Sequence, residues 1–301
     1  MRLRPFGLAA ASLGLTGLGV FGGAVLEARS YTLRQTSAPV LPPGSAPLRV
    51  LHISDIHLVS SQQRKIDWIR ALAELEPDLV INTGDNITSA QAVPRLFEAL
   101  DPLLDVPGAF VFGSNDYYAP KFKNPLNYLR PTRHGSSGPA TPNLPWQQLR
   151  DGFSARGWVD LTHQRALLDV GGLRVELRGT DDGHLDRDRY DQVAGASDAS
   201  VDLSVGVTHA PYLRLLDAMA GDQLDLVLAG HTHGGQVCLP TGALVTNCDL
   251  DTERVKGLST HTHEGHTSWL HVSAGLGTSP YAPYRLFCRP EAVLLRLTAR
   301  A

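Results

Sequence analysis

Residues 48–57 read LRVLHISDIH, an apolar run followed directly by an acid and a histidine. The run from Leu48 to Ile53 predicts a buried strand, and Asp55 and His57 stand just past its end. If the backbone stays extended there, the one-residue spacing turns both side chains to the same face, where together they can bind one metal ion. This stretch therefore predicts a strand that ends in a metal-binding loop.

The same arrangement recurs four times along the chain. Apolar runs at 79–81, 109–112, 203–207 and 224–229 each lead into polar residues of metal-binding type. These residues are Asp85 with Asn86, Ser114 with Asn115 and Asp116, His209, and His231 with His233. In a layered α/β fold the carboxyl ends of neighbouring strands open on one crevice, so distant residues can share a site. The five clusters together predict a two-metal centre.

The order of the remaining patterns favours an α/β fold. A strand is expected at 31–40, at the edge of a sheet, and apolar residues between Ile66 and Leu75 have helical spacing up to Pro77. A second helix begins at Pro94. The first third of the chain thus alternates strand and helix, which indicates a sheet with helices packed on its faces.

Composition limits the classes of function. The chain has 301 residues, of which 43% are hydrophobic, enough for one large globular domain and too many for a disordered protein. The formal net charge of -3 gives no basic excess that would favour nucleic acid as a partner. The three cysteines, Cys238, Cys248 and Cys288, permit one disulfide and one free thiol, or buried apolar roles.

The N-terminal segment predicts an association with a membrane. Residues 6–26 carry no charge and follow two arginines, and about 20 such residues suffice to span a bilayer. We expect a membrane anchor in residues 1–30 and a catalytic domain in residues 31–301 on the extracytoplasmic side. The alternative is a signal sequence that is cut after Ala24, which would export the domain.

A long segment without periodicity interrupts the predicted domain. Residues 117–145 are rich in Pro, Gly, Asn and Ser, and they directly follow one of the predicted metal-binding clusters. A loop of this length within a compact domain is usually functional or mobile. It is either a lid that shapes the substrate site or a solvated insertion without a role.

The ordered clusters resemble those of the calcineurin-like metallophosphoesterase superfamily over residues 48–298. The best-matching stretches are Asp55-Ile56-His57, Gly84-Asp85 and 230–236, which reads GHTHGGQ. Residues 235–236, the N-terminal anchor, and the motifs at 275–277 and 289–291 look like a bacterial membrane-associated branch. That branch includes UDP-diacylglucosamine pyrophosphohydrolases and general phosphodiesterases.

The resemblance implies a fold, a metal site and a reaction. The fold is a four-layer α/β/β/α sandwich, and the cofactors are two divalent metal ions, which can be Mn, Fe, Zn or Co. Asp85 bridges the two ions. One ion is held by Asp55, His57 and His233, and the other by an asparagine-type ligand, His209 and His231. A hydroxide between the ions then attacks a phosphoester in line.

One motif departs from the family pattern. Where the family has Gly-Asn-His-Asp, this chain reads Gly113-Ser114-Asn115-Asp116. Aligned without a gap, Ser114 takes the place of the asparagine ligand and Asn115 that of the histidine that assists the leaving group. Shifted by one residue, Asn115 is the ligand and Asp116 follows it. We favour Asn115 as ligand and Asp116 beside it as a catalytic residue, because an amide oxygen binds hard cations better than a hydroxyl does.

In both alignments the helper imidazole is missing from its usual place. The proton for the leaving group would then come from Asp116, Tyr117, Asp182 or His184. Without such a group, activity would be slow or limited to esters with good leaving groups.

Three weaker patterns have two interpretations each. His261, His263 and His266 follow no apolar run, so they indicate an exposed loop rather than a metal site. Asp182, at the end of the stretch 179–182, is either a carboxylate behind the metal ligands or part of a turn. Arg285 and Arg289 could pair with a substrate phosphate or be structural.

The sequence as a whole predicts a membrane-anchored phosphoesterase with two metal ions. Its substrate would be a small, nucleotide-linked or lipid-linked phosphodiester or pyrophosphate ester at the cell envelope. The competing prediction is a module that binds metal or phosphate without turnover, because the helper histidine is absent.

Overall fold

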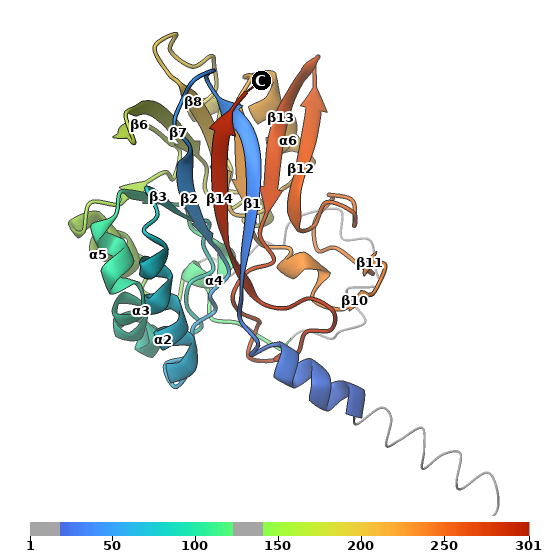
Figure 1. Ribbon diagram of the computed structural model, residues 1–301. Coiled ribbons are helices and arrows are strands. Elements are labelled where there is room, and N and C mark those ends of the chain that lie inside the picture. The colour runs from blue at the N-terminus through green and yellow to red at the C-terminus, as the bar shows by residue number, and fades with distance from the viewer. Residues whose placement is uncertain (1–18, 123–140, 301) are drawn as a thin grey trace, which may run out of the picture.

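The computed structural model describes residues 19–122 and 141–300, and most of its strands form two six-stranded sheets packed face to face (Figure 1). The first sheet consists, in spatial order, of β1 (Thr32–Leu41), β14 (Glu291–Ala299), β2 (Leu48–Ile53), β3 (Leu79–Asn82), β4 (Gly108–Phe110) and β5 (Val159–Asp160). The second consists of β12 (Gly257–His263), β13 (His266–Val272), β9 (Leu226–Ala229), β8 (Leu203–Thr208), β7 (Leu173–Gly179) and β6 (Gln164–Val170). A separate short hairpin contains β10 (Cys238–Leu239) and β11 (Gly242–Ala243).

Helices cover the outer faces of both sheets. The first sheet packs against α2 (Gln63–Ala71), α3 (Val93–Leu100) and α5 (Trp146–Ala155), and the second against α6 (Leu213–Gly221) (Figure 1). The turn α4 (Ser114–Tyr117) follows β4. Single 3₁₀ turns lie at Leu72–Leu75, Ala90–Ala92, Asp101–Asp105, Gly183–Leu185, Tyr190–Gln192 and His233–Gly235. The order of layers is helix, sheet, sheet, helix, as expected.

Alternation along the strands sorts side chains between these layers. In β3, Leu79 and Ile81 join the core between the two sheets, whereas Val80 points to the helical side. Because successive side chains in a strand point to opposite faces, a strand buried on both faces reads as a continuous apolar run. This explains why the sequence reveals β3 and β8 as runs and not as alternating patterns.

Strand direction places the polar clusters at one end of the sandwich. β2, β3, β4 and β5 are mutually parallel, and so are β7, β8, β9 and β13. The loops that follow β2, β3, β4, β8 and β9 therefore leave from carboxyl ends that converge, as a topology of this kind requires.

Most predicted elements are confirmed, with small shifts at their ends. β1 is an edge strand that pairs with β14 alone, and α2 becomes a 3₁₀ turn before Glu76 adopts a left-handed conformation. The prediction for His261, His263 and His266 was wrong, since these residues lie on the paired strands β12 and β13 and not in an exposed loop. The sequence 257–272 lacks a hydrophobic run because β12 is an edge strand, with an intermediate or exposed face along most of its length.

The N-terminal part of the described chain is a helix at residues 19–27. The backbone N–H of Arg285 donates to the carbonyl of Ala24 at 2.9 Å, and the Phe21 and Tyr284 rings are 6.1 Å apart. In the described ranges, no helix is both long enough and apolar enough to cross a membrane. The predictions for residues 1–18 and for most of the insertion at 117–145 fall outside the described residues.

A pair of buried histidines joins the two sheets. Nδ1 of His52 on β2 lies 2.9 Å from Nδ1 of His271 on β13, and Nε2 of His52 lies 3.0 Å from the Thr83 hydroxyl. Burial lowers the pKa of His52 well below its usual value and that of His271 to about 3. Both rings are therefore neutral at pH 7, and one nitrogen of the pair donates to the other.

This pair makes stability depend on pH. The unfolded chain takes up a proton at His271 below pH of about 6.5, whereas the folded protein does so only near pH 3, so the neutral ring stabilises the fold above about 6.5 and this contribution is lost as the pH falls. We expect wild type to lose about 2 kcal/mol more of its free energy of unfolding than His271→Gln does between about pH 7 and 5. Urea denaturation at both pH values measures this difference, and equal losses in the two proteins would contradict the assignment.

Candidate metal centre

The seven predicted ligands lie in the five loops at the convergent strand ends. Asp55 and His57 follow β2, Asp85 follows β3, and Asn115 lies in α4 after β4. From the second sheet, His209 follows β8, and His231 and His233 follow β9. The two sheets thus contribute to one cluster, and α4, which carries Asn115, is labelled in Figure 1.

The first group contains one carboxylate and two imidazoles. Oδ1 of Asp55 lies 3.9 Å from Nε2 of His57 and 3.7 Å from Nε2 of His233. The two imidazole nitrogens are 3.2 Å apart. These three atoms are close enough to bind one ion.

Asp85 lies between this group and a second one. Its Oδ2 is 3.4 Å from Nε2 of His57, and its Oδ1 is 3.6 Å from Nε2 of His209. Nδ1 of His231 is 3.3 Å from the same His209 nitrogen. Asp55 also lies within reach of the atoms of Asp85 and His209, so it borders both groups. The two oxygens of Asp85 therefore face different sets of ligands.

Asn115 is the member of its motif that contacts Asp85. Its backbone N–H donates to Oδ1 of Asp85 and its side-chain amide to Oδ2, both at 2.7 Å. The Ser114 hydroxyl lies 3.4 Å from the Asn115 amide. A rotation of the amide by 180° would turn its oxygen toward this side, as a cation ligand requires.

The loops hold their ligands in a left-handed backbone conformation. Asp55, His57, Asp85, His231 and His233 have φ of 48°, 42°, 58°, 70° and 50°. The expectation of an extended backbone from Asp55 to His57 was wrong, although the two side chains do converge. Each such residue costs on the order of 1–3 kcal/mol, and the cost is tolerated where surrounding contacts fix the conformation, commonly at functional sites.

Glycine is required beside the carboxylates. A Cβ atom on Gly230 would lie 1.9 Å from the Ser54 hydroxyl and 2.6 Å from Oδ2 of Asp55. One on Gly113 would lie 2.3 Å from Oδ1 of Asp85. These two loops approach the carboxylates so closely that no larger residue fits without displacement.

Backbone carbonyls fix the tautomers of two imidazoles. Nδ1 of His209 lies 2.7 Å from the carbonyl of Thr83, and Nδ1 of His233 lies 3.1 Å from that of Gly277. A ring nitrogen that donates to a carbonyl carries a proton, which leaves Nε2 as the nitrogen that can bind a metal. In both rings Nε2 is the atom that faces the carboxylates.

The pKa shifts within the cluster show that its carboxylates favour a positive charge beside them. Burial lowers the pKa of His57 to about 4 and that of His233 well below its usual value, whereas burial raises the pKa of Asp55 to about 6. Burial opposes charge on His209 too, but the Asp85 and Asp182 carboxylates outweigh it and raise the pKa of His209 to about 9. The field that holds this proton would equally hold a metal cation, which would displace it.

These residues fit divalent metal ions. Oδ1 of Asp55 is buried and has no hydrogen-bond partner in the described part of the chain. Neutral imidazole nitrogens face each other and the carboxylates, where a cation would satisfy all of them.

Of the residues considered as proton donors, three are buried. Asp116 accepts hydrogen bonds from the backbone N–H groups of Asp85, Asn86 and Gly113, at 2.8–3.0 Å. It therefore holds the Asp85 loop in place. The hydroxyl of Tyr117 donates to Asp181 at 2.9 Å. Asp182 is buried behind His209, and burial raises its pKa to about 7.

His184 is the partly exposed member of that set. Its ring lies 4.5 Å from the ring of His231, and its Nδ1 is 3.1 Å from the Tyr212 hydroxyl. Its backbone N–H donates to Asp182 at 2.8 Å. An imidazole therefore borders the second group from a different part of the chain than the family motif.

Two buried basic residues support the site, and sequence reasoning missed one of them. Lys65 is buried on α2, where burial lowers its pKa to about 7, and its side-chain nitrogen donates to the carbonyl of Ile56, between two predicted ligands, at 2.8 Å. Its only signal is a charge beside apolar positions of α2. Arg285 is also buried and donates to the carbonyls of Ala274 and Gly277, at 2.6 and 2.7 Å, so its role is structural. Arg289 is exposed.

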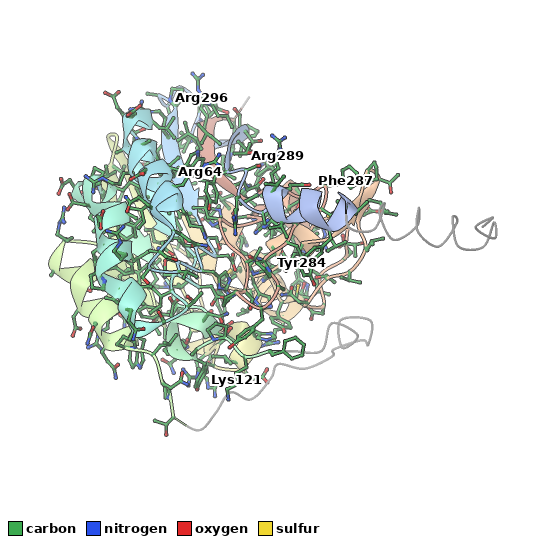
Figure 2. All side chains as sticks on the ribbon, turned by 90° about the horizontal axis from the view of Figure 1, so that it is seen from below. Arg64, Lys121, Tyr284, Phe287, Arg289 and Arg296 are labelled. Atoms are coloured by element: carbon green, nitrogen blue, oxygen red, sulfur yellow. The ribbon has the colours of Figure 1, made fainter. Side chains whose placement is uncertain are left out.

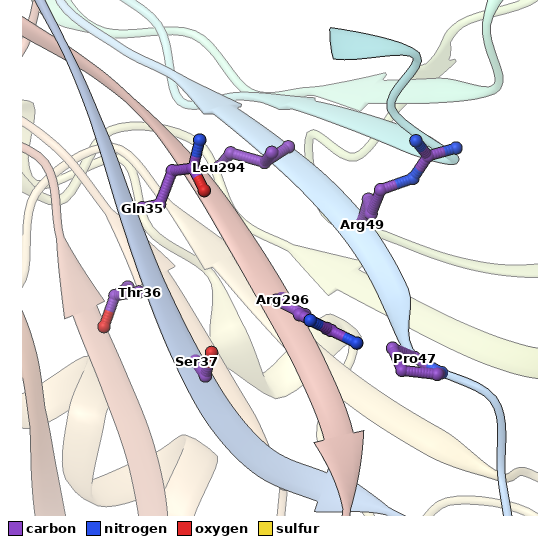
Figure 3. Close-up of a pocket in the computed structure, with 7 residues that line it drawn as sticks. All are labelled: Gln35, Thr36, Ser37, Pro47, Arg49, Leu294 and Arg296. Atoms are coloured by element: carbon purple, nitrogen blue, oxygen red, sulfur yellow. The ribbon is translucent and has the colours of Figure 1, made fainter.

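Other predicted residues lie apart from the ligands. His261 accepts or donates a hydrogen bond with Asp217 of α6 at 2.7 Å and lies 3.1 Å from Arg254, which is a structural arrangement. Cys238, Cys248 and Cys288 are all buried and free. A groove along β1, β14 and β2 is lined by Gln35, Thr36, Ser37, Pro47, Arg49, Leu294 and Arg296 (Figure 3). None of the predicted ligands lines that groove.

Comparisons with known proteins agree with this geometry. The sequence profile of the calcineurin-like phosphoesterases matches residues 48–235. The chain is 29% identical to YpbG of Bacillus subtilis over 196 residues, which is 64% of each protein. It is 24% identical over 258 residues to the phosphodiesterase YaeI of Escherichia coli, covering 84% of this chain and 83% of YaeI.

A eukaryotic protein is also similar. The bovine transmembrane protein with metallophosphoesterase domain is 27% identical over 271 residues, which cover 86% of this chain and 55% of the bovine protein. The chain thus spans less than two thirds of the length of YpbG and of the bovine relative. Because the family profile extends over more than half of its residues, this chain belongs to the calcineurin-like phosphoesterases and is a metal-dependent phosphoester hydrolase.

Proposed function

We propose that this protein hydrolyses a phosphodiester or pyrophosphate ester at the cell envelope with two divalent metal ions. The observation that carries the proposal is the position of Asp85, whose two oxygens lie 3.4 Å from His57 and 3.6 Å from His209. A carboxylate that faces two sets of ligands suits a bridge between two cations. The mixed nitrogen and oxygen ligands suit Mn, Fe, Zn or Co.

The chain's own residues prepare the site for this reaction. Asp55, His57 and His233 would hold one ion, His209, His231 and Asn115 the other, and Asp85 both. Two such ions supply a water of lowered pKa and neutralise charge on the phosphoryl oxygens. The carbonyls of Thr83 and Gly277 bond Nδ1 of two imidazoles, so that Nε2 is the nitrogen available to a metal, and Asp116 fixes the loop that presents Asp85.

The side chains near the expected leaving group differ from those of the family motif. Asn115 can donate a hydrogen bond but cannot transfer a proton at neutral pH. His184, at the edge of the second group, is the imidazole that reaches this region from elsewhere in the fold. This arrangement favours esters whose leaving groups need little protonation, such as pyrophosphates.

Location and substrate class rest on the N-terminal segment and the relatives. Residues 6–26 are uncharged, the Escherichia coli relative is named a phosphodiesterase, and the bovine relative is named a transmembrane protein. We therefore extend the proposal to a membrane anchor in residues 1–30 and to lipid-linked or nucleotide-linked substrates. Tethering raises the local concentration of substrates held at the same surface.

The bridging role of Asp85 can be tested by substitution. We expect Asp85→Asn to lower metal content and the hydrolysis of a chromogenic phosphodiester together, the latter by at least about a hundred-fold, because the amide cannot supply two anionic oxygens. Elemental analysis and steady-state kinetics with Mn²⁺ measure both. Asp67→Asn on the exposed face of α2 is the control. Unchanged metal content in Asp85→Asn would contradict the proposed bridge.

Added metal should also stabilise the fold. At a free Mn²⁺ concentration of about 100 times Kd, we expect the free energy of unfolding to rise by about 2.7 kcal/mol, and Asp85→Asn to lose most of this gain. Thermal unfolding with Mn²⁺ and with a chelator measures the effect. Full metal occupancy and stabilisation without any turnover would favour the binding module over the enzyme.

A matched pair of variants decides between Ser114 and Asn115. We expect Asn115→Ala to lower metal content and diesterase activity by about ten-fold or more, and Ser114→Ala to leave both within about two-fold, because Asn115 is the residue in contact with Asp85. The reverse pattern would identify Ser114 as the ligand. It would place Asn115 where the family has its helper histidine.

A further inference from the structure

Exposed apolar side chains gather around the helix at residues 19–27. In the described part of the chain, the large apolar residues that are exposed are Val20, Phe21, Leu26, Phe122, Leu167, Leu239, Leu244, Tyr281 and Phe287. Only Leu167, on β6, lies on an element remote from this helix. The others belong to the helix, to the β10–β11 hairpin region at 238–244, to the segment 281–289, or, as Phe122 does, pack on Tyr281. We call the helix, the hairpin and the segment the docking face.

A groove runs through this face. Its apolar lining includes Leu26 from the helix, Leu239 from the hairpin and Phe287 from the C-terminal segment, and these side chains are 69%, 50% and 56% exposed. Figure 2 shows Phe287, Tyr284 and Arg289 beside the helix. Large apolar surface of this kind, rimmed by polar residues, marks contact with a protein or a membrane.

The charges around the groove are predominantly positive. Arg34, Lys256 and Arg289 line it, together with a single acid, Glu27, and Arg34 is paired with the buried Glu291 behind the lining. Both oxygens of Glu27 accept hydrogen bonds from backbone N–H groups, those of Phe287 at 3.1 Å and Cys288 at 2.6 Å. Basic residues next to exposed aromatic and aliphatic side chains are typical of surfaces that lie on anionic lipid.

The sequence indicates which partner lies next to the docking face. The uncharged run at 6–26 ends inside the helix of the docking face, so the chain enters the described domain here. If that run is held in a bilayer, as we propose for the function, the bilayer surface lies next to the exposed side chains. In the described part of the chain, we find no feature that would direct a second copy of the protein to this face.

We propose that the docking face lies against a phospholipid bilayer that contains anionic headgroups. Leu26, Leu239 and Phe287 enter the boundary between headgroups and acyl chains, while Lys256 and Arg289 contact phosphate. Each basic residue near such a surface increases partitioning by about five-fold. The proposal rests on the proposed envelope location, but its test reads lipid contact and not hydrolysis, so the two can fail separately.

Contacts connect the docking face to the metal centre. The helix binds the backbone of Arg285 through Ala24, and the Arg285 side chain donates to the carbonyl of His233 at 3.4 Å. The bilayer surface would then lie near the loops that carry the ligands. This arrangement suits substrates that are held in the bilayer and carry their phosphoester at the level of the headgroups.

Tryptophan reporters in the full chain test the contact. We place Leu239→Trp, Phe287→Trp and, as a control, Leu167→Trp in protein bound to vesicles of phosphatidylcholine and phosphatidylglycerol, in a ratio of roughly two to one, with brominated acyl chains. Bromine quenches only nearby indole rings, and the signal of the wild-type tryptophans is subtracted. We expect loss of fluorescence at positions 239 and 287 and none at 167.

The outcomes separate the possible occupants. Reporters at 239 and 287 that respond like the one at 167 would overturn the proposal. Emission that changes with the protein-to-lipid ratio but not with bromine would also overturn it, in favour of a second copy of the chain. In a further pair of variants, Phe287→Asp should reduce the quenching of the reporter at position 239, and the control Leu167→Asp should leave it unchanged. Circular dichroism and activity on a soluble diester confirm that each variant is folded.

Discussion

The need to neutralise two buried carboxylates dominates this structure. Asp55 and Asp85 are both buried, and their polar neighbours are imidazoles, amides and the Ser54 hydroxyl. Burying an anion without a cation is expensive, so the fold must supply or bind positive charge there. The raised pKa keeps a proton on His209, which neutralises part of this negative charge. A bound metal ion would neutralise the rest. The two sheets, their convergent loops and the close-fitting glycines all serve to assemble these groups.

Much of this could be predicted from sequence because the strands are buried on both faces. Continuous apolar runs located β2, β3, β8 and β9 to within a few residues, and the polar residues at their ends converge as strand topology requires. The edge hairpin β12–β13 could not be found this way, since its side chains alternate without a hydrophobic run. The predicted division of the ligands between two ions came from the family resemblance, since spacing alone could not supply it, and it stays a prediction.

The backbone conformation and contacts of the predicted ligands could not be predicted from the sequence. Nothing in the residue types of Asp55 or His57 indicates a left-handed backbone, because that conformation is imposed by hydrogen bonds to the neighbouring loop at 84–86. Lys65 was missed for a related reason, since its ammonium is satisfied by a carbonyl that only the folded loop presents. Likewise the contact of Asn115 with Asp85 depends on how α4 turns after β4.

The position of Ala24 constrains the order of events during biogenesis. Its side chain is buried, and its carbonyl is bonded to the backbone of Arg285, near the other end of the chain. A peptidase that cleaved after this residue would need an extended, accessible substrate, which the folded protein does not offer. If the N-terminal segment is a signal sequence that is cut after Ala24, the cut would thus have to precede the docking of this helix on the segment around Arg285.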